Sequence, residues 1–64
     1  MGMKIYYVEY RYSPTEWVVD APFDDYKSAE YYMKNQITFA KAGVAGSLNG
    51  YGEDDFRITE REYD

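Results

Sequence analysis

Acidic side chains are the main groups in this sequence that could take part in chemistry. Asp24-Asp25 and Glu53-Asp54-Asp55 are its two runs of neighbouring carboxylates. Such groups can bind Mg²⁺ or Ca²⁺, or act as an acid and a base. Calcium-binding loops space their ligands at fixed intervals around a glycine, and neither run has that spacing. We therefore expect Asp24-Asp25 to cap a helix, and Glu53-Asp54-Asp55 to form either a solvated loop end or an acidic contact patch.

The sequence contains neither cysteine nor histidine. This composition excludes Cys/His zinc sites, thiol nucleophiles and imidazole as a general base. The glycine-rich segment 43–52 lacks the Gly-Lys-Ser/Thr ending of a phosphate-binding loop, and it follows an expected helix instead of preceding one. We predict that the protein is not an enzyme and has no catalytic residues, no bound metal and no cofactor.

Tyrosine is frequent, with nine residues among 64. Four are expected in the core: Tyr6, Tyr10, Tyr12 and Tyr32. Four others are expected to be exposed: Tyr7, Tyr31, Tyr51 and Tyr63. Tyrosine is enriched at interface hot spots because it offers a large, fairly rigid contact area and a hydroxyl group. The exposed tyrosines are therefore either ordinary strand and helix residues or parts of a binding surface.

The formal charge is −5, because twelve Asp and Glu residues stand against seven Lys and Arg. A negative surface repels phosphate backbones, so we expect no direct contact with nucleic acid unless the few basic residues cluster. The charge either favours a protein partner with a basic surface or serves only to keep a small protein in solution.

The sequence shows no targeting or membrane segment. No apolar run approaches the ~20 residues of a membrane span, and no secretory hydrophobic region follows the start. We expect no membrane contact and a cytoplasmic location, which the lack of cysteine also fits. Met1-Gly2, placed before Met3, has the form of an expression remnant.

Residues 1–64 are enough for one domain, which is expected to begin with a β-hairpin. Residues 4–12 and 16–21 are rich in aromatic and β-branched types, as strands are. Ser13-Pro14-Thr15-Glu16 between them has the composition of a type I turn. A four-residue loop predicts three cross-strand pairs on the core face: Tyr12 with Trp17, Tyr10 with Val19, and Val8 with Ala21.

Pro22 is expected to end the second strand, and Asp24 or Asp25 to cap a helix over residues 25–42. The residues of its core stripe recur at helical spacing: Ala29, Tyr32, Met33, Gln36, Ile37 and Ala40. Gly43 is the expected C-cap and begins a flexible loop that extends to residue 52. A last strand should begin at Phe56.

This order of elements predicts an α+β fold, β-β-α-β, with a three-stranded antiparallel sheet and one helix packed on one face. The first strand should be central, which gives the spatial order 2-1-3. The residues expected on the uncovered face are Ile5, Tyr7, Glu9, Arg11, Val18, Asp20, Arg57 and Thr59. That face is either plain solvent surface or half of an interface.

Several segments together resemble small accessory proteins encoded by bacteriophages. They are Trp17-Val18-Val19, Phe23-Asp24, Ser28-Ala29-Glu30-Tyr31-Tyr32 and Phe56-Arg57-Ile58-Thr59-Glu60. Phage proteins of this size and acidity include anti-CRISPR and other anti-defence inhibitors. The resemblance implies an inhibitor of a bacterial defence protein, acting in the cytoplasm of the bacterial host.

The first hypothesis is therefore a non-enzymatic inhibitor that binds a defence or nucleic-acid-binding protein through an acidic, tyrosine-rich surface. The residues expected to contact its partner are Glu30, Tyr31, Tyr51, Glu53, Asp54 and Asp55. The alternative is a homo-oligomeric structural or regulatory module, such as a homodimer, that assembles through a sheet edge or the open sheet face.

Overall fold

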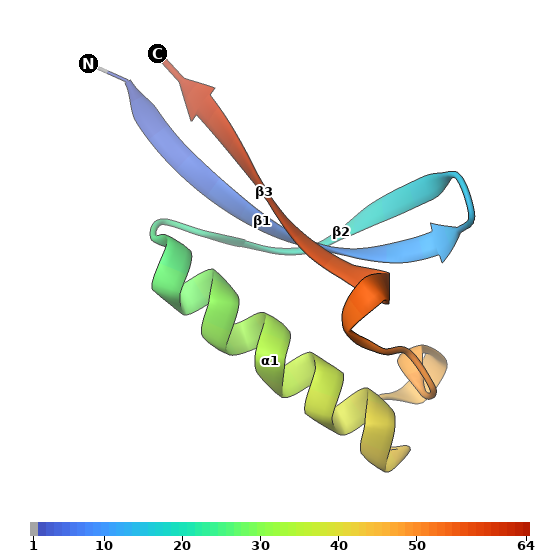
Figure 1. Cartoon of the computed structure of the whole chain (residues 1–64). Helices are drawn as coiled ribbons and strands as arrows, with labels where there is room; N and C mark the ends of the chain where they lie inside the picture. Colours follow the sequence, from blue (N-terminus) through green and yellow to red (C-terminus); the bar gives the residue numbers. More distant parts are fainter. Residues whose placement is uncertain (1) are drawn as a thin grey trace.

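The computed structural model describes residues 2–64 (Figure 1). Its elements are β1 (Met3–Ser13), β2 (Glu16–Phe23), α1 (Tyr26–Ala42), the short 3-10 turns η1 (Gly46–Leu48) and η2 (Glu53–Asp55), and β3 (Phe56–Tyr63). Met1 lies outside the described residues. The prediction that Met1-Gly2 is an expression remnant concerns this residue and stays a prediction. No helix between residues 2 and 64 is long and apolar enough to cross a membrane.

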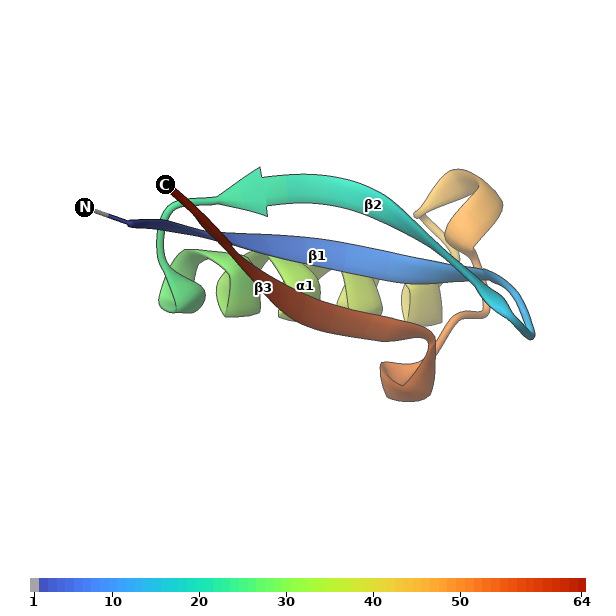
Figure 2. The same ribbon diagram turned by 90° about the horizontal axis from the view of Figure 1, so that it is seen from above.

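The three strands form one antiparallel sheet in the order β2-β1-β3, with β1 in the centre. The helix α1 lies against one face of it, and the view from above shows the sheet in front of the helix (Figure 2). The predicted α+β fold and its strand order are confirmed. The face turned away from α1 is called the open face below.

A β-bulge at Asp20 shifts the predicted hairpin register. Val8 pairs with Ala21, as predicted, but its neighbour Glu9 pairs with Val19, which leaves Asp20 without a cross-strand partner. One extra residue turns the side chains on the far side of the bulge to the other face of the sheet. Val19 therefore lies on the open face, 48% exposed, and its prediction as a core residue was wrong.

The pairs nearer the hairpin turn are shifted as well. Tyr10 pairs with Val18, one residue earlier than predicted, and Arg11 pairs with Trp17. Trp17 thus shares the open face with Arg11, because residues directly opposite each other point to the same side. Tyr12 falls in a second irregularity of the ladder and is 67% exposed. The predicted core pair of Tyr12 and Trp17 was wrong, because strict alternation does not anticipate bulges.

Pro22 does not end β2, contrary to the prediction. It pairs with Tyr7, and the strand continues to Phe23. Proline is tolerated here because β2 is an edge strand, where one side needs no ladder hydrogen bonds. The longer strand brings Phe23 opposite Tyr6, just before the chain enters α1.

The ends of α1 agree with the prediction. Asp25 is the N-cap, and its Oδ1 accepts a hydrogen bond of 2.9 Å from the backbone N–H of Ser28. Gly43 closes the other end in the left-handed conformation, with φ of 77°. On the helix surface, Lys34 Nζ lies 3.9 Å from Glu30 Oε1, four residues earlier on α1.

The core lies between α1 and the sheet and is small. Its buried apolar side chains are Val8, Ala29, Ile37, Ala40 and Phe56. The three helix residues among them belong to the predicted stripe, whose other members Tyr32, Met33 and Gln36 are half-buried. The side of β1 that faces α1 carries Tyr6, Val8 and Tyr10. In the neighbouring strand β3, Ile58 pairs with Val8 and Phe56 pairs with Tyr10, so both point to the same side.

The segment after α1 has more local structure than the flexible loop that was predicted. The backbone N–H of Ala45 donates to Oδ1 of Asn49 at 2.6 Å. The N–H of Gly50 donates to the carbonyl of Ala40 at 3.0 Å, and Gly50 has a φ of 89°. These bonds hold the segment against the last turn of α1 and direct the chain back to β3.

The ends of β1 and β3 extend past β2 as a two-stranded ribbon. Met3 pairs with Tyr63 and Ile5 pairs with Arg61, whereas β2 reaches only as far as Phe23. Figure 1 shows this ribbon projecting beyond α1, with both chain ends at its tip. The molecule is accordingly elongated, with extents of 42 × 24 × 16 Å.

Candidate functional site

The six predicted contact residues lie in two separate places. Glu30 and Tyr31 are on α1. Of the other four, Tyr51 lies two residues before the turn η2, and Glu53, Asp54 and Asp55 form that turn. Glu53 pairs with Lys41 near the end of α1. The helical rise between residues 30 and 41 separates the two groups by roughly 16 Å. They are therefore not one compact patch.

Two of the three carboxylates before β3 already have basic partners. Lys41 Nζ donates a hydrogen bond to Glu53, and this bond lowers the pKa of Glu53. Asp55 lies 3.6 Å from Nε of Arg11, and its other oxygen accepts a backbone N–H at 3.0 Å. Asp54 is exposed, and no ion pair holds its carboxylate among residues 2–64. Asp54 is the most available charge of this run.

Tyr51 is half-buried and packs against other aromatic rings. Its ring centroid lies 6.4 Å from that of Tyr10 and 6.0 Å from that of Phe56, both in edge-to-face geometry. Such pairs add to the energy of burial. Tyr51 therefore closes one end of the core and presents only part of its side chain to a partner.

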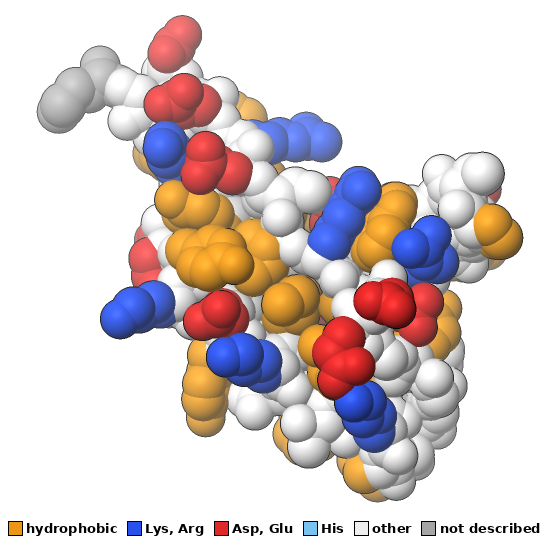
Figure 3. All heavy atoms as spheres, in the orientation of Figure 1, with side chains coloured by type: hydrophobic (Ala, Val, Ile, Leu, Met, Phe, Trp, Pro, Cys, Tyr) orange, Lys and Arg blue, Asp and Glu red, His pale blue; other side chains and the backbone are white. Residues whose placement is uncertain are grey.

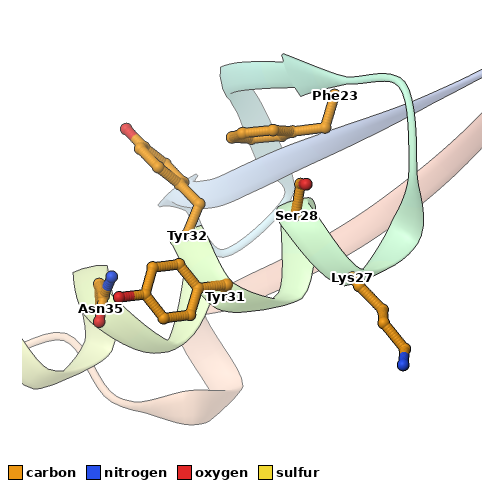
Figure 4. A pocket seen from close by; sticks show the side chains of 6 residues that line it. All are labelled: Phe23, Lys27, Ser28, Tyr31, Tyr32 and Asn35. Carbon is orange, nitrogen blue, oxygen red and sulfur yellow. The ribbon is translucent and has the colours of Figure 1, made fainter.

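Tyr31 is 71% exposed, and it borders a hollow of about 400 Å³ (Figure 4). The hollow is lined by Phe23, Lys27, Ser28, Tyr31, Tyr32 and Asn35. Figure 4 shows Phe23 coming from the end of β2 and the other five from α1. The last residue of β2 and one side of the helix thus build a concave, mainly apolar site.

Two aromatic rings form the inner part of this hollow. The centroids of Phe23 and Tyr32 are 5.2 Å apart, with the rings tilted. Burial raises the pKa of Tyr32, and the nearby carboxylate of Asp20 adds to the effect. Oδ2 of Asp20 is buried and has no hydrogen-bond partner in the described part of the chain.

A second hollow of about 460 Å³ adjoins the first and shares Phe23 and Ser28 with it. The rest of its lining is Ile5, Pro22, Asp24 and Asp25. The hydrogen bond from the backbone N–H of Ser28 lowers the pKa of Asp25. We call the lining of both hollows the Phe23 surface. It combines exposed apolar area with the carboxylates of Asp24 and Asp25 and the ammonium group of Lys27.

The sequence prediction included Tyr31 but missed the rest of the Phe23 surface. A signal was present, because Ser28, Tyr31, Tyr32 and Asn35 follow the i, i+3, i+4, i+7 spacing of one helix side. The contribution of Phe23 had no such signal. It depends on β2 continuing through Pro22, which was predicted to end the strand.

The open face holds a cluster that was predicted in part: Arg11 and Arg57 were expected there, whereas Trp17 was expected in the core. All three arginines of the chain lie there: Arg11, Arg57 and Arg61. The guanidinium carbons of Arg11 and Arg57 lie 4.6 Å and 4.3 Å from the centroid of the Trp17 ring. Figure 3 shows blue basic side chains next to orange apolar ones over β3 and the hairpin, and red acidic ones near η2.

A buried carboxylate fixes one of these arginines. Glu9 is only 6% exposed, and its Oε1 accepts a hydrogen bond of 2.6 Å from Nε of Arg57. Its Oε2 accepts a bond of 3.2 Å from the hydroxyl of Thr59. Because Glu9 uses only the Nε donor, the two terminal nitrogens of Arg57 are not taken up by this pair.

A second aromatic–arginine unit lies nearer the ribbon. The hydroxyls of Tyr7 and Tyr63 are 2.7 Å apart, and their hydrogen bond raises the pKa of Tyr7. The guanidinium carbon of Arg61 lies 5.7 Å from the Tyr7 ring centroid. The open face thus carries two aromatic side chains, each with a guanidinium group over it.

Side chains from residues 2–64 form no group of three potential metal ligands. No protein-family model, curated protein or solved structure matches this chain. The geometry offers two different surfaces: the Phe23 surface, which is apolar and acidic, and the open face, which is aromatic and rich in arginine.

Proposed function

We propose that this chain is a non-enzymatic inhibitor that binds another protein through the Phe23 surface. The observation that carries the proposal is the position of Tyr31, exposed at the rim of an apolar hollow. A partner could bury Tyr31 and place a side chain against Phe23 and Tyr32 at the same time. Buried aromatic side chains beside a filled pocket are the usual source of binding energy at protein interfaces.

Carboxylates near this surface favour a basic partner. Asp24 and Asp25 line the second hollow, and Glu30 follows on α1, where it pairs with Lys34 across the helix surface. Asp54 lies in the turn η2, next to the residue that pairs with the last turn of α1. It adds a charge without an ionic partner in the described residues. Complementary charges at an interface mainly speed association and orient the two proteins. We propose that Tyr31 provides contact area while these carboxylates pair with Lys and Arg of the target.

The resemblance to phage accessory proteins suggests the kind of target. Proteins that bind nucleic acid expose Lys and Arg to neutralise phosphates. A small protein with a charge of −5 can occupy such a surface and block it. We therefore propose a bacterial defence protein, or another nucleic-acid-binding protein, as the partner, and the bacterial host cytoplasm as the place of action.

The test begins with capture of a partner from bacterial lysate on the immobilised chain and its identification by mass spectrometry. The purified partner is then titrated with wild-type protein and with Tyr31→Ala by calorimetry. We expect the substitution to weaken binding by at least roughly 30-fold, as for a hot-spot tyrosine.

Phe39→Ala provides the matched control, because Phe39 is another exposed aromatic residue of α1 and lies outside the Phe23 surface. Its affinity should stay within about twofold of wild type. Equal affinities for Tyr31→Ala and wild type would exclude the Phe23 surface as the contact.

The homo-oligomer alternative has less support. Of the two edge strands, β2 contains Pro22 and the bulge at Asp20, two features that hinder edge-to-edge pairing through that edge. On the open face, a two-fold contact would bring the arginines of one copy toward those of the other. Sedimentation over a range of concentrations checks this, and a concentration-dependent dimer would restore the alternative.

A further inference from the structure

We propose that the open face binds single-stranded nucleic acid, at a site separate from the Phe23 surface. The total charge argues against such binding unless the basic residues cluster. That condition is met, because every arginine of the chain lies on the open face. The four lysines are elsewhere: Lys4, Lys27, Lys34 and Lys41.

The side chains of this face match what an unpaired strand requires. Proteins hold single strands by stacking bases on aromatic rings or guanidinium planes and by placing positive charge along the phosphates. Trp17 with Arg57 forms one such unit, and Tyr7 with Arg61 forms another. Both units are built on strands of a sheet, which keeps their spacing fixed.

Both arginines of β3 keep nitrogen donors that no carboxylate of the described chain takes up. Arg57 gives only its Nε to Glu9, and Arg61 makes no ion pair within residues 2–64. They are four residues apart on the same side of one strand, so their Cα atoms are separated by roughly 13 Å. Thr59 lies between them. This row can follow a backbone that carries a charge on every nucleotide.

Charge also defines where the strand would lie. Arg11 is bound to the acidic turn, because its Nη2 donates to the Asp54 carbonyl at 3.3 Å and its Nε lies near Asp55. These carboxylates repel phosphates at that end of the face. We therefore place the bound nucleic-acid strand along Arg57 and Arg61, toward the two-stranded ribbon formed by β1 and β3.

An acidic protein segment is the competing occupant, and the aromatic side chains argue against it. Carboxylates would pair with the guanidinium groups but would make little use of the rings of Trp17 and Tyr7. Bases use both, because every base has a face that stacks.

The only tryptophan of the chain lies in this site, so its fluorescence reports binding directly. The full chain is titrated at low salt with an oligothymidylate of about ten nucleotides, within the usual site size of such proteins. We expect a saturable change in emission. Two phosphate contacts predict that log K falls with log salt at a slope of about −1.4.

Arg61→Gln is the decisive variant, because Arg61 is exposed and has no ion pair in the described chain that its removal would break. It should weaken binding at least roughly fivefold and reduce the salt slope by about 0.7. Lys27→Gln changes the net charge equally but lies on α1, and it should bind like wild type. Arg57→Gln is a second variant, with its folding checked by circular dichroism because Glu9 loses a partner.

Three results would overturn the proposal. One is the lack of any saturable signal with the oligonucleotide at low salt. Another is tighter binding of a glutamate peptide of the same length, which would identify an acidic protein as the occupant. The third is equal weakening by Arg61→Gln and Lys27→Gln, which would show an effect of net charge alone.

Discussion

Glu9 illustrates how a single residue determines the geometry around it. Among residues 2–64 it is the buried charged side chain of the sheet, and both of its oxygens are used, by Arg57 and Thr59. A buried carboxylate is costly unless it is paired and hydrogen-bonded. Pairing with Nε holds the guanidinium group of Arg57 over Trp17. Glu9 is therefore a positioning residue for the open face.

We predict that Glu9→Ala lowers the free energy of unfolding by about 1–3 kcal/mol, because it leaves Arg57 and Thr59 without their acceptor. Urea unfolding, followed by circular dichroism, measures the change. Glu16→Ala, at an exposed position of β2, should stay within about 0.5 kcal/mol of wild type. Equal effects of the two substitutions would mean that the buried network adds nothing.

Asp25 and Asp24 form a natural pair for testing the helix cap. Asp25 accepts the N–H of Ser28, whereas Asp24 is exposed and makes no side-chain hydrogen bond in the described chain. We predict a lower urea midpoint for Asp25→Ala at neutral pH, and little change for Asp24→Ala.

The lowered pKa of Asp25 sets the pH dependence of this effect. A carboxyl group whose pKa is lower in the folded state stabilises the fold above its ordinary value of 3.8, and this contribution is lost as the pH falls through the folded value. The difference in urea midpoint between wild type and Asp25→Ala should therefore become smaller as the pH falls toward about 2. A gap that stays constant from neutral pH downward would contradict a contribution from the ionised cap.

At the scale of elements, local signals predicted α1 well. The carboxylate before the helix and the glycine after it give each end a clear residue, and the core spacing fills the turns between them. The strand order followed from the need to cover one face of a three-stranded sheet with one helix. These features depend on neighbours in sequence or on the count of elements, and both are visible without a structure.

The register of β2 was not predictable in the same way. The choice between a regular ladder and a bulge at Asp20 depends on how the sheet twists against α1, which involves residues far apart in the chain. That choice moved Trp17 from the core to the open face. The arginines of the open face were therefore predicted, but the position of Trp17 between them was not, whereas the exposed Tyr31 was predicted.

Gly43 and Gly52 allow the effect of backbone conformation on a Gly→Ala substitution to be measured apart from steric clash of the added methyl group. An added Cβ meets nothing within 4 Å at Gly43 or at Gly52, but Gly43 has a φ of 77° and Gly52 a φ of −121°. We predict that Gly43→Ala destabilises the protein by about 1–2 kcal/mol. Gly52→Ala should be neutral or stabilise it by up to about 1 kcal/mol. Thermal unfolding measures both, and equal losses would show that φ is not the cause.

The whole molecule separates its charges by face. Its net charge is −5, yet the arginines gather on the open face while Asp24, Asp25 and Glu30 lie by the Phe23 surface. A charge placed at a given site acts on nearby partners within about a Debye length, whereas net charge acts on all of them. One small acidic protein can therefore carry one surface that favours basic partners and another that favours negatively charged partners.

Asp54 tests this separation because it should affect the two partners in opposite directions. Asp54→Lys replaces an exposed charge next to Arg11 and changes the net charge from −5 to −3. We expect slower association with a basic protein partner at low salt, by roughly tenfold, and tighter binding of the oligonucleotide. Glu62→Lys makes the same change of net charge at the ribbon, outside the Phe23 surface, and is the control for the association rate with the protein partner. Stopped-flow mixing measures the first rate and Trp17 emission the second affinity. If both variants slowed association equally, net charge alone would explain the effect, and the position of Asp54 would have no role.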